Sequence, residues 1–486
     1  LEALRQDDGL DPCVSACWMP ASELAASPRR FVRLLGLNSS RWPRGSSEDR
    51  LLSHHIVPTE ELDPLPFAAA DRRDFETILA TTERQVVLSR ARRSDEGRLL
   101  GRSALLLKLQ TAETYLGRNA VPAHAFSETD RLMARPGEFQ DLPQAQAAAK
   151  CWSNWRRTDI TPHDGVVRAD HPVIRAILDR VQSASSLSLL LRNPLGFVWR
   201  YGLRWRAPES GEDPLVLDAL AMGDLVHQTL YKALLTLEAG TGLAQAGEEE
   251  IAAAVDGAAG EAARLWQQER ATPPRVIWER TIDDVRALST NALAFRDERL
   301  VGARAYGEVA FGGADAKSGI DNPWDAAAAV EIPNTGFRVR GYIDRLDVSA
   351  DGRYASVRDY KTGKPPQKDD IVVNGGRELQ RCLYAFAVKA MLGGDVAIRA
   401  SLFYARGEKN MPLADPEATL QMIAGCLDTA RTSLTRGGAV MGRDTGGEYD
   451  DLAFALPANV RATYRVRKEA AATERLGEAA LVWEAD

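Results

Sequence analysis

The sequence predicts an α/β fold in which a mixed central sheet is flanked by helices, and three observations support this prediction. Apolar and polar residues roughly alternate in 341–347, as a half-buried strand requires, and 354–361 is predicted to be the return strand. Asp351-Gly352 lies between them, and this dipeptide tolerates the positive φ of tight hairpin turns. Amphipathic segments on either side of this hairpin, at 217–235 and 377–392, predict helices that cover the sheet.

The segments beyond this hairpin extend the same pattern. Residues 246–304 predict two long helices, and Glu308 begins another strand just before the hairpin. Helical stretches are also expected at 142–156 and 171–183. The tail carries two short strand signals, at 464–467 and 480–484.

The hairpin carries two carboxylates and a lysine that suit metal-dependent chemistry. Asp359 and Lys361 are two residues apart on one strand, so their side chains leave the same face. Asp344 approaches them from the partner strand. Carboxylates hold Mg²⁺, and a nearby ammonium can orient water or stabilise a charged transition state. Only ten of the 61 basic residues are lysines, so a lysine at this position in an arginine-rich chain is informative.

Two helical pairs flank these groups in the sequence. Gly223 lies four residues before His227 on the upstream helix, and Gln380 lies four residues before Tyr384 on the downstream helix. Each pair alone is more often an ordinary helix surface. The order Gly-x3-His, Gly-x-x-Asp-Arg-x-Asp, Asp-Tyr-Lys-Thr-Gly and Gln-x3-Tyr is much more specific.

Together the four blocks resemble the PD-(D/E)XK nucleases of the RecB/AddB type, over about residues 183–410. The resemblance implies a restriction-endonuclease-like core and hydrolysis of DNA with Mg²⁺ or Mn²⁺, leaving a 5′-phosphate and a 3′-hydroxyl. It implies that His227, Asp344 and Asp359 bind the metal and that Lys361 activates water or stabilises the transition state. Gln380 and Tyr384 would brace the site and contact the DNA backbone.

Arginines near the core are candidate contacts for DNA. Arg192, Arg200 and Arg204 are interleaved with aromatic residues, a mixture that suits single-stranded DNA. Arg345 is a further candidate, although it can instead support the hairpin through an ion pair with Asp347. Glu308 is a candidate acidic group that supports the metal ligands or adds to them.

The sequence departs from many relatives of this type in its cysteines. Those relatives hold an iron–sulfur cluster with one cysteine before a proline and three after the nuclease core. Here Asn193 precedes Pro194 and no cysteine trio follows, so no iron–sulfur cluster is expected. Packing by Phe197, Trp199, Tyr201 and Trp205 is expected to brace this region instead.

The chain is expected to have four parts. Residues 1–115 resemble part of a motor domain of an AddB-like helicase-nuclease, and 116–182 form a helical connector. Residues 183–445 form the nuclease domain, and 446–486 a C-terminal extension. No G-x4-G-K-[ST] phosphate loop occurs, so no ATP site is expected. The chain begins with Leu and is interpreted as the C-terminal portion of a longer protein, with a missing motor region or a helicase-nuclease partner subunit.

Composition limits the class of protein. The formal net charge of −7 excludes a uniformly basic nucleic-acid coat protein, but a local basic groove remains compatible with it. No run of 18 apolar residues occurs, so no membrane span is expected, and the odd number of five cysteines argues against a disulfide framework. A cytoplasmic location is therefore predicted.

These observations favour a metal-dependent deoxyribonuclease, in particular an exonuclease acting on single-stranded ends in DNA repair and recombination. Two alternatives stay open. The chain could be a non-catalytic DNA-binding scaffold within a helicase-nuclease complex, or a free-standing defence nuclease that acts without a motor.

Overall fold

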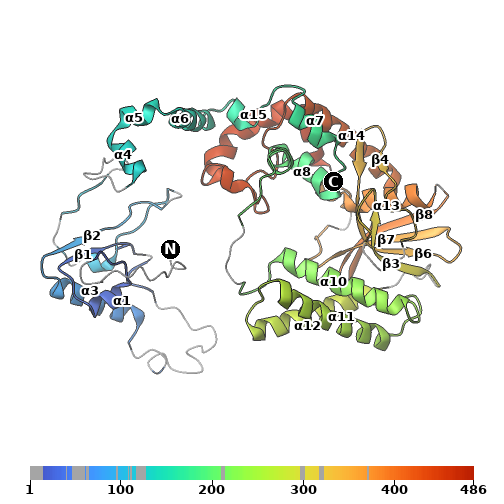
Figure 1. Ribbon diagram of the computed structural model, residues 1–486, viewed down its shortest axis with the longest axis horizontal. Helices are drawn as coiled ribbons and strands as arrows, with labels where there is room; N and C mark the ends of the chain where they lie inside the picture. The colour runs from blue at the N-terminus through green and yellow to red at the C-terminus, as the bar shows by residue number, and fades with distance from the viewer. Residues whose placement is uncertain are drawn as a thin grey trace. The chain divides into compact units, whose positions relative to one another are not determined.

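The computed structural model describes residues 15–39, 41–45, 61, 65–94, 97–107, 109, 112–116, 127–208, 214–295, 302–316, 322–368, 371–393 and 395–485. The chain divides into two compact units, Leu1–Leu142 and Pro143–Asp486. Each unit combines a sheet with helices (Figure 1) and has a hydrophobic core of its own.

The first unit contains a small parallel sheet covered by a helix. Strands β1 (Phe31–Leu34) and β2 (Gln85–Leu88) pair in parallel, with Phe31 opposite Gln85. Helix α3 (Phe67–Thr81) connects them and contributes Phe75 and Ile78 to the core. The origin of this region from a motor domain stays a prediction. The described part of this unit also contains the helices α1 (Ala21–Ala25), η1 (Ala104–Leu106), α4 (Glu128–Ala134) and α5 (Pro136–Asp141).

The second unit is built on a five-stranded mixed sheet in the order β3-β6-β7-β8-β9. The pairs β3–β6, β6–β7 and β8–β9 are antiparallel, whereas β7 and β8 are parallel. A separate hairpin, β4–β5, lies outside this sheet. The strands are β3 (Arg304–Phe311), β4 (Val330–Ile332), β5 (Phe337–Val339), β6 (Gly341–Val348), β7 (Tyr354–Lys361), β8 (Ala397–Tyr404) and β9 (Lys409–Pro412).

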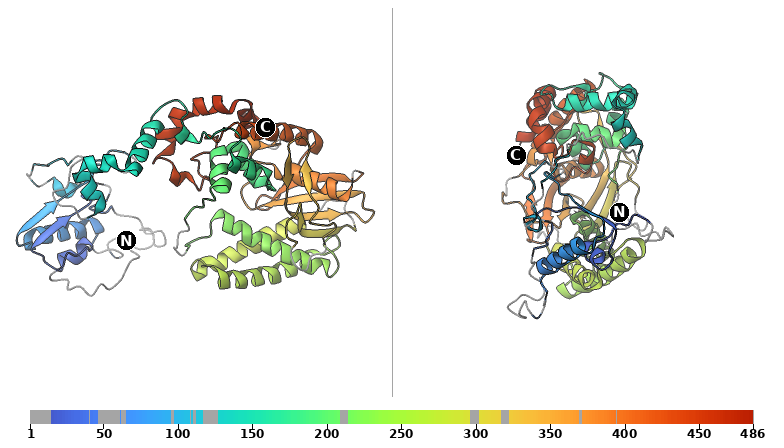
Figure 2. Two further views of the ribbon diagram at one scale, coloured as in Figure 1. Left: turned by 45° about the horizontal axis from the view of Figure 1, so that its top comes forward. Right: turned by 90° about the vertical axis from the view of Figure 1, so that its left-hand side faces the viewer.

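Helices cover both faces of this sheet, as Figures 1 and 2 show. On one face lie α10 (Ala219–Glu238), α11 (Glu248–Glu269) and α12 (Arg275–Ala294), whose apolar sides form one core. The helices α7 (Pro172–Asp179), α8 (Ala184–Arg192), α13 (Gln380–Leu392) and α14 (Pro416–Thr435) form the other core with the opposite face. The predicted mixed sheet flanked by helices is therefore confirmed.

The remaining elements of this unit are short or lie in the tail. They are α6 (Pro143–Trp155), η2 (Pro162–Asp164), α9 (Pro194–Phe197), η3 (Val198–Gly202), η5 (Asn374–Gly376), η6 (Ala453–Ala455), η7 (Arg461–Arg465), α15 (Val466–Leu476) and η8 (Gly477–Glu484).

The two strands predicted in the tail are wrong, because both segments are helical. Lys468 is fully buried on α15, where its ammonium donates to the backbone oxygens of Asn154 and Asp159 and to Asp164. The Tyr464 hydroxyl donates to the same Asp164 carboxylate. These contacts with residues about 300 positions away fix the helical tail, and a local strand pattern cannot report them.

A polar network joins the segment around Asn193 to the loop that follows α14. The Asn193 Oδ1 accepts hydrogen bonds from Gly196 N at 3.0 Å and from the Thr445 hydroxyl at 2.6 Å. The Thr445 Oγ1 in turn accepts from Gly442 N, and the Asn193 amide donates to Asp450. Of the aromatic residues predicted to brace this region, Phe197 is buried against Tyr201, whereas Trp205 is 41% exposed. Hydrogen bonds therefore contribute to the bracing that packing alone was expected to supply.

Candidate metal centre and active site

His227 reaches the sheet from α10, whose N-cap is Asp218. The Asp218 carboxylate caps the helix by accepting from Ala221 N at 2.7 Å. Leu225, Val226 and Leu230 anchor α10 in the helical core. This leaves His227 beside the sheet, with Nδ1 3.3 Å from the Asp344 carboxylate and Nε2 3.2 Å from the Tyr360 carbonyl oxygen.

The strands β3 and β6 are both irregular where they carry Glu308 and Asp344. Alternate residues of a strand share a face. Yet Ala305 packs in the core with α10, while Val309 packs in the opposite core. Glu308 has φ of +50°, and the ladder between β3 and β6 lacks the Glu308–Asp344 pair. The side-chain alternation therefore reverses at Glu308, which directs its carboxylate into neither core.

The hairpin strands β6 and β7 separate at the same level. Their ladder extends from Val348 opposite Ala355 to Arg345 opposite Arg358 and goes no further within the described residues. Beyond it the Asp344 carboxylate accepts a hydrogen bond from Tyr360 N at 2.8 Å, in place of a backbone partner. The acidic side chains thus lie where the sheet opens.

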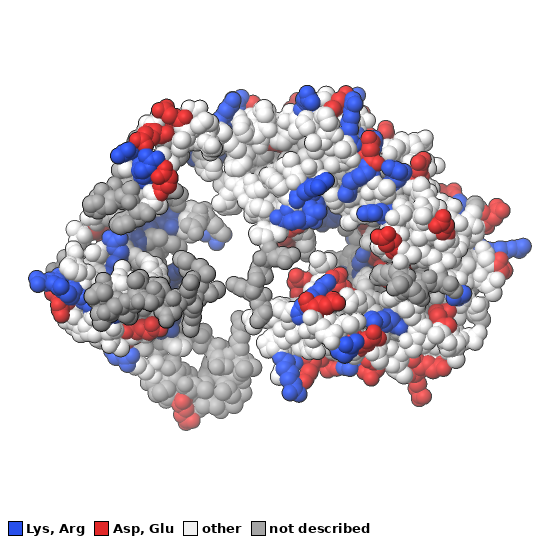
Figure 3. Space-filling view, in the orientation of Figure 1, with Lys and Arg blue, Asp and Glu red and all other residues white. Residues whose placement is uncertain are grey.

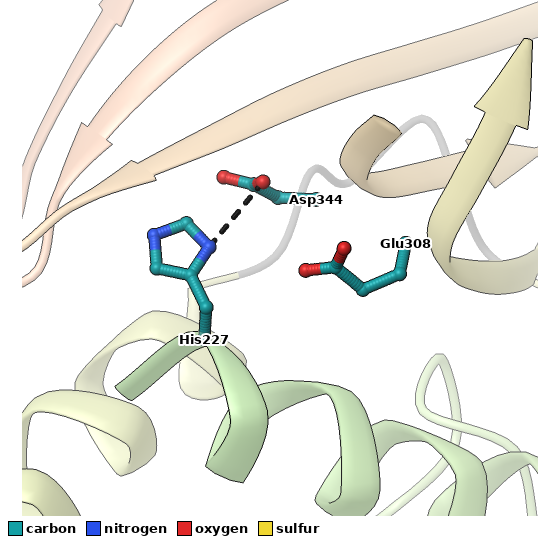
Figure 4. Close-up of side chains that lie close together, drawn as sticks. All are labelled: His227, Glu308 and Asp344. Carbon is teal, nitrogen blue, oxygen red and sulfur yellow. Dashed lines mark ion pairs between the residues drawn. The ribbon is translucent and has the colours of Figure 1, made fainter. Parts of the chain in front are cut away.

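Three potential metal ligands converge in this opening. One donor atom each of His227, Glu308 and Asp344 can be chosen so that all lie within 4.8 Å of one another. Figure 4 shows both carboxylates directed toward the imidazole. They line a pocket of about 670 Å³, which Lys361 and Tyr404 also line. Carboxylate oxygens are ligands that suit Mg²⁺ or Mn²⁺, and an imidazole nitrogen is a ligand that transition-metal ions accept more readily than Mg²⁺ does.

A second group of side chains joins the pocket to α13. The Lys361 ammonium lies 2.5 Å from the Asp359 carboxylate and donates to Gln380 Oε1 at 2.6 Å. The Gln380 amide donates to the Tyr384 hydroxyl at 3.4 Å. Asp359 is buried, whereas the Lys361 side chain is 33% exposed. Asp359 and Gln380 therefore hold an ammonium that is still accessible from the pocket.

The two aspartates have opposite pKa shifts. Burial would raise the pKa of Asp344, but the charge and hydrogen bond of His227 outweigh it and lower that pKa. Burial raises the pKa of Asp359 to about 6, against the opposing effect of Lys361. Burial would lower the pKa of His227, yet Asp344, with Asp359 and Glu308, raises it to about 9. When two carboxylates share one site, their pKa values are expected to differ in this way.

The structure brings together most of the residues that the sequence pointed to. His227, Asp344, Asp359, Lys361 and the Gln380–Tyr384 pair all lie at this site. The set of converging donors differs from the predicted one, since Glu308 is part of it and Asp359 is paired with Lys361 instead. The register of β3 against β6 places Glu308 there, and no local sequence pattern reports that register.

The predicted DNA contacts of two arginines need correction. Arg192 is 6% exposed and its guanidinium is held by Asp444 and by the Gly375 carbonyl. Arg345 is 4% exposed and donates to Asp347 at 2.8 Å and to the Tyr360 hydroxyl. Both side chains are inside the protein, where ion pairs satisfy them, so they support the fold. Arg200 is ion-paired with Asp451, and Arg204 is exposed.

Among the described residues, no helix is both long and apolar enough to cross a lipid bilayer. No curated protein matches the sequence. A family model of the PD-(D/E)XK nuclease superfamily matches residues 181–474, a range that contains the whole sheet and every residue of the pocket. The match covers more than half of the chain, and the chain therefore belongs to the PD-(D/E)XK nuclease superfamily.

Proposed function

We propose that this chain is a metal-dependent deoxyribonuclease of the RecB/AddB type that hydrolyses phosphodiester bonds. The observation that carries the proposal is the convergence of His227, Glu308 and Asp344 beside an accessible Lys361 ammonium. Metal ligands and a positive charge on one pocket wall are what hydrolysis of a charged diester requires.

The donor set supports a divalent cation, which members of this superfamily generally use. His227, Glu308 and Asp344 would hold Mg²⁺ or Mn²⁺, and the ion would lower the pKa of bound water and offset charge on a phosphoryl oxygen. Asp359 could become a ligand only by exchanging part of its contact with Lys361. Its buried carboxylate adds negative charge to the site in either case.

Lys361 is proposed to act on the reacting phosphate or the attacking water. Its ammonium is compact and is held by two partners, Asp359 and Gln380. Burial would lower the pKa of Lys361, but Asp359 outweighs this effect and raises it, so the side chain stays charged at neutral pH. A charged Lys361 can donate to a phosphoryl oxygen as negative charge develops there.

Gln380 and Tyr384 are proposed to position Lys361, and since Tyr384 is buried, only Gln380 is proposed to contact the DNA backbone as well. They lie one turn apart on α13 and hydrogen-bond to each other. The Tyr384 ring packs edge-on against Phe311 with centroids 5.6 Å apart, which fixes its orientation. Substitution of either residue should therefore alter the placement of the ammonium without removing a metal ligand.

The proposed process is exonucleolytic processing of DNA ends in repair and recombination, beside a helicase-nuclease partner. Support for it comes from the order of the four sequence blocks, which resembles proteins that work at double-strand breaks. A hydrolysis that leaves a 5′-phosphate and a 3′-hydroxyl is proposed on the same basis.

A cleavage assay on end-labelled single-stranded and duplex DNA tests the proposal. The chain is incubated with Mg²⁺, Mn²⁺ or EDTA, beside an Asp344→Asn variant. We expect metal-dependent cleavage that the variant lacks, with DNA binding retained. Binding of DNA without cleavage in either metal would favour a scaffold subunit and reject the nuclease. Circular single-stranded DNA distinguishes exonucleolytic from endonucleolytic action, because only an endonuclease cuts it.

A further inference from the structure

The turn that follows η3 holds a strained residue at its end. Leu203 N donates to Val198 O and Trp205 N donates to Trp199 O, both at 3.0 Å, which closes the turn. Arg204 has φ of +59°, a conformation that costs a non-glycine residue on the order of 1 kcal/mol. Such strain persists where a structure has a use for the geometry. Its result here is that Arg204, Trp205 and Arg206 are all exposed.

Further arginines surround this turn. The Arg180 guanidinium lies over the Tyr201 ring, 3.6 Å from its centroid. Burial lowers the pKa of Arg180, and the positive charges of Arg340 and Arg206 lower it further against the opposing effect of Tyr201. Several cations are therefore gathered at one place although they repel one another. A poly-anion is the ligand that would relieve this repulsion.

Three arginines on this surface lack acidic partners. Within the described part of the chain, Arg204, Arg206 and Arg340 form no salt bridge, and all three are exposed. The Arg206 guanidinium donates to the backbone oxygens of Arg200 and Trp205, which holds the side chain in place without neutralising it. The charge of Arg206 is thus held in position, and none of the three charges is paired with a described acidic side chain.

An indole ring lies beside these cations. Trp205 packs against Trp199 with ring centroids 5.3 Å apart and an interplanar angle of 39°, and it remains 41% exposed. Nucleic-acid bases stack on such rings irrespective of sequence, and only unpaired bases offer their faces. The combination of aromatic and cationic groups favours a single strand over a duplex.

The surface is connected to the catalytic pocket through β6. Arg340 directly precedes this strand, and Asp344 follows four residues later, so the two backbones are separated by about 13 Å at most along an extended chain. Residues 180 and 182 are fixed next to β5, since Gln182 N donates to Arg338 O and Arg340 N donates to Gln182 O, both at 2.8 Å. In Figure 3, Lys and Arg side chains gather on this side of the second unit, close to the position of α8 in Figure 1.

We propose that Arg180, Arg204, Arg206 and Arg340, together with Trp205, form a platform that binds single-stranded DNA and leads it to the pocket. The arginines bind phosphates, and Trp205 stacks with a base. The proposal rests on the nuclease function proposed above, since it assigns the substrate of that same site.

Binding of a fluorescein-labelled dT25 strand, measured by anisotropy in EDTA at several salt concentrations, tests the platform. We expect the double variant Arg206→Glu/Arg340→Glu to bind at least tenfold more weakly at low salt, with a slope of log affinity against log salt reduced by about 1.4, since each lost phosphate contact removes about 0.7. The conservative variant Arg206→Lys/Arg340→Lys should bind within threefold of the wild type. Trp205→Ala should weaken binding about fivefold or more, because one base stack is lost.

The matched control carries the same change of charge on the helices α11 and α12, as Arg264→Glu/Arg280→Glu. Both control residues are exposed. Thermal unfolding of each variant shows whether it is folded. Equal losses of affinity for dT25 in the platform and control variants would overturn the proposed platform. Tighter binding of a blunt duplex than of dT25 would do the same.

The same samples separate this inference from the proposed function. If the wild type cleaves dT25 with Mn²⁺ but the platform variant binds it normally, the platform is wrong and the nuclease stands. If the wild type cleaves no DNA but the platform variant loses affinity for dT25, the surface binds a single strand and the nuclease is wrong.

Discussion

Replacement of Glu308 by glutamine tests whether the irregular strand pair builds the metal site. Glutamine has nearly the same volume and retains one oxygen, but it removes a full negative charge from the group of three donors. We expect Mn²⁺ to bind the variant more weakly. The fold should be unchanged, since Glu308 lies in the opening of the sheet rather than in either core.

The size of the effect follows from the geometry. The donor atoms lie within 4.8 Å of one another, so a cation between them is nearer still to the Glu308 carboxylate. A divalent cation 4 Å from one negative charge interacts with it by about 8 kcal/mol at an effective dielectric constant of about 20, twice the value for two unit charges. The amide oxygen and water replace much of this energy. We therefore expect a loss of about 1.4 to 4 kcal/mol, which corresponds to roughly tenfold to a thousandfold in affinity.

Titration calorimetry of the metal-free protein with Mn²⁺ at neutral pH measures this loss. Glu417→Gln is the control, since Glu417 is exposed on α14 and pairs with Lys389. Asp359→Asn is compared in the same experiment and should lower the affinity less than Glu308→Gln. An unchanged affinity in Glu308→Gln, combined with loss of binding in Asp359→Asn, would refute the reasoning and make Asp359 the ligand, as the sequence alone predicted.

Three further predictions concern the ammonium, the polar brace and an acidic ion pair. Lys361→Arg should lower the rate of single-turnover cleavage about a hundredfold or more with an unchanged melting temperature, because a planar guanidinium cannot occupy the position of the ammonium. The control Lys364→Arg, on the exposed loop, should cleave normally. Thr445→Val should lower the free energy of unfolding in urea by about 1–3 kcal/mol, because it leaves buried partners unsatisfied, whereas the exposed Thr463→Val should change it by less than about 0.5 kcal/mol. Burial would raise the pKa of Asp444, but two arginines lower it to about 2. The stabilising effect of the Asp444 carboxylate is therefore complete above about pH 4 and is lost as the pH falls through 2. In an acid titration, the free energy of unfolding should decrease less between pH 5 and 2 for Asp444→Asn than for the wild type. An unchanged free energy of unfolding in Thr445→Val, or the same loss of stability in acid for Asp444→Asn as for the wild type, would contradict these assignments.

The sequence predicted the parts of the fold that depend on local pattern. Alternation and the Asp-Gly turn identified the β6–β7 hairpin, and amphipathic periodicity identified α10, α11, α12 and α13. Residues spaced two or four apart, such as Asp359 and Lys361 or Gln380 and Tyr384, were correctly expected to share a strand face or a helix face. These expectations succeed because neighbours along the chain determine them.

Features that depend on distant partners were beyond such patterns. The tail reads as strands locally, but a buried ion pair between Lys468 and Asp164 holds it as helix. Arg192 lies in a stretch of arginines and aromatic residues that favours DNA binding, and Asp444, 252 positions away, withdraws its side chain from the surface. The ion pair of Arg345 with Asp347, two residues along β6, was expected from the sequence as an alternative to DNA contact. The charge of an arginine is visible in the sequence, whereas the position of its counter-ion is a property of the tertiary structure.

The opening of the sheet explains why candidate metal ligands from two neighbouring strands and a helix can meet at all. In a regular ladder, the side chains of Glu308 and Asp344 would project from one face and be covered by a helical layer. The side-chain alternation reverses at Glu308, and β6 separates from β7 at the same level. Backbone groups there consequently lack the hydrogen-bond partners that a regular ladder would give them. Asp344 satisfies one of them by accepting from Tyr360 N, and the Tyr360 carbonyl oxygen turns to His227. The same irregularity that interrupts the sheet therefore supplies both the space and the polar groups of the candidate centre, and restoring a regular β3–β6 pair would remove the site even with every ligand residue present.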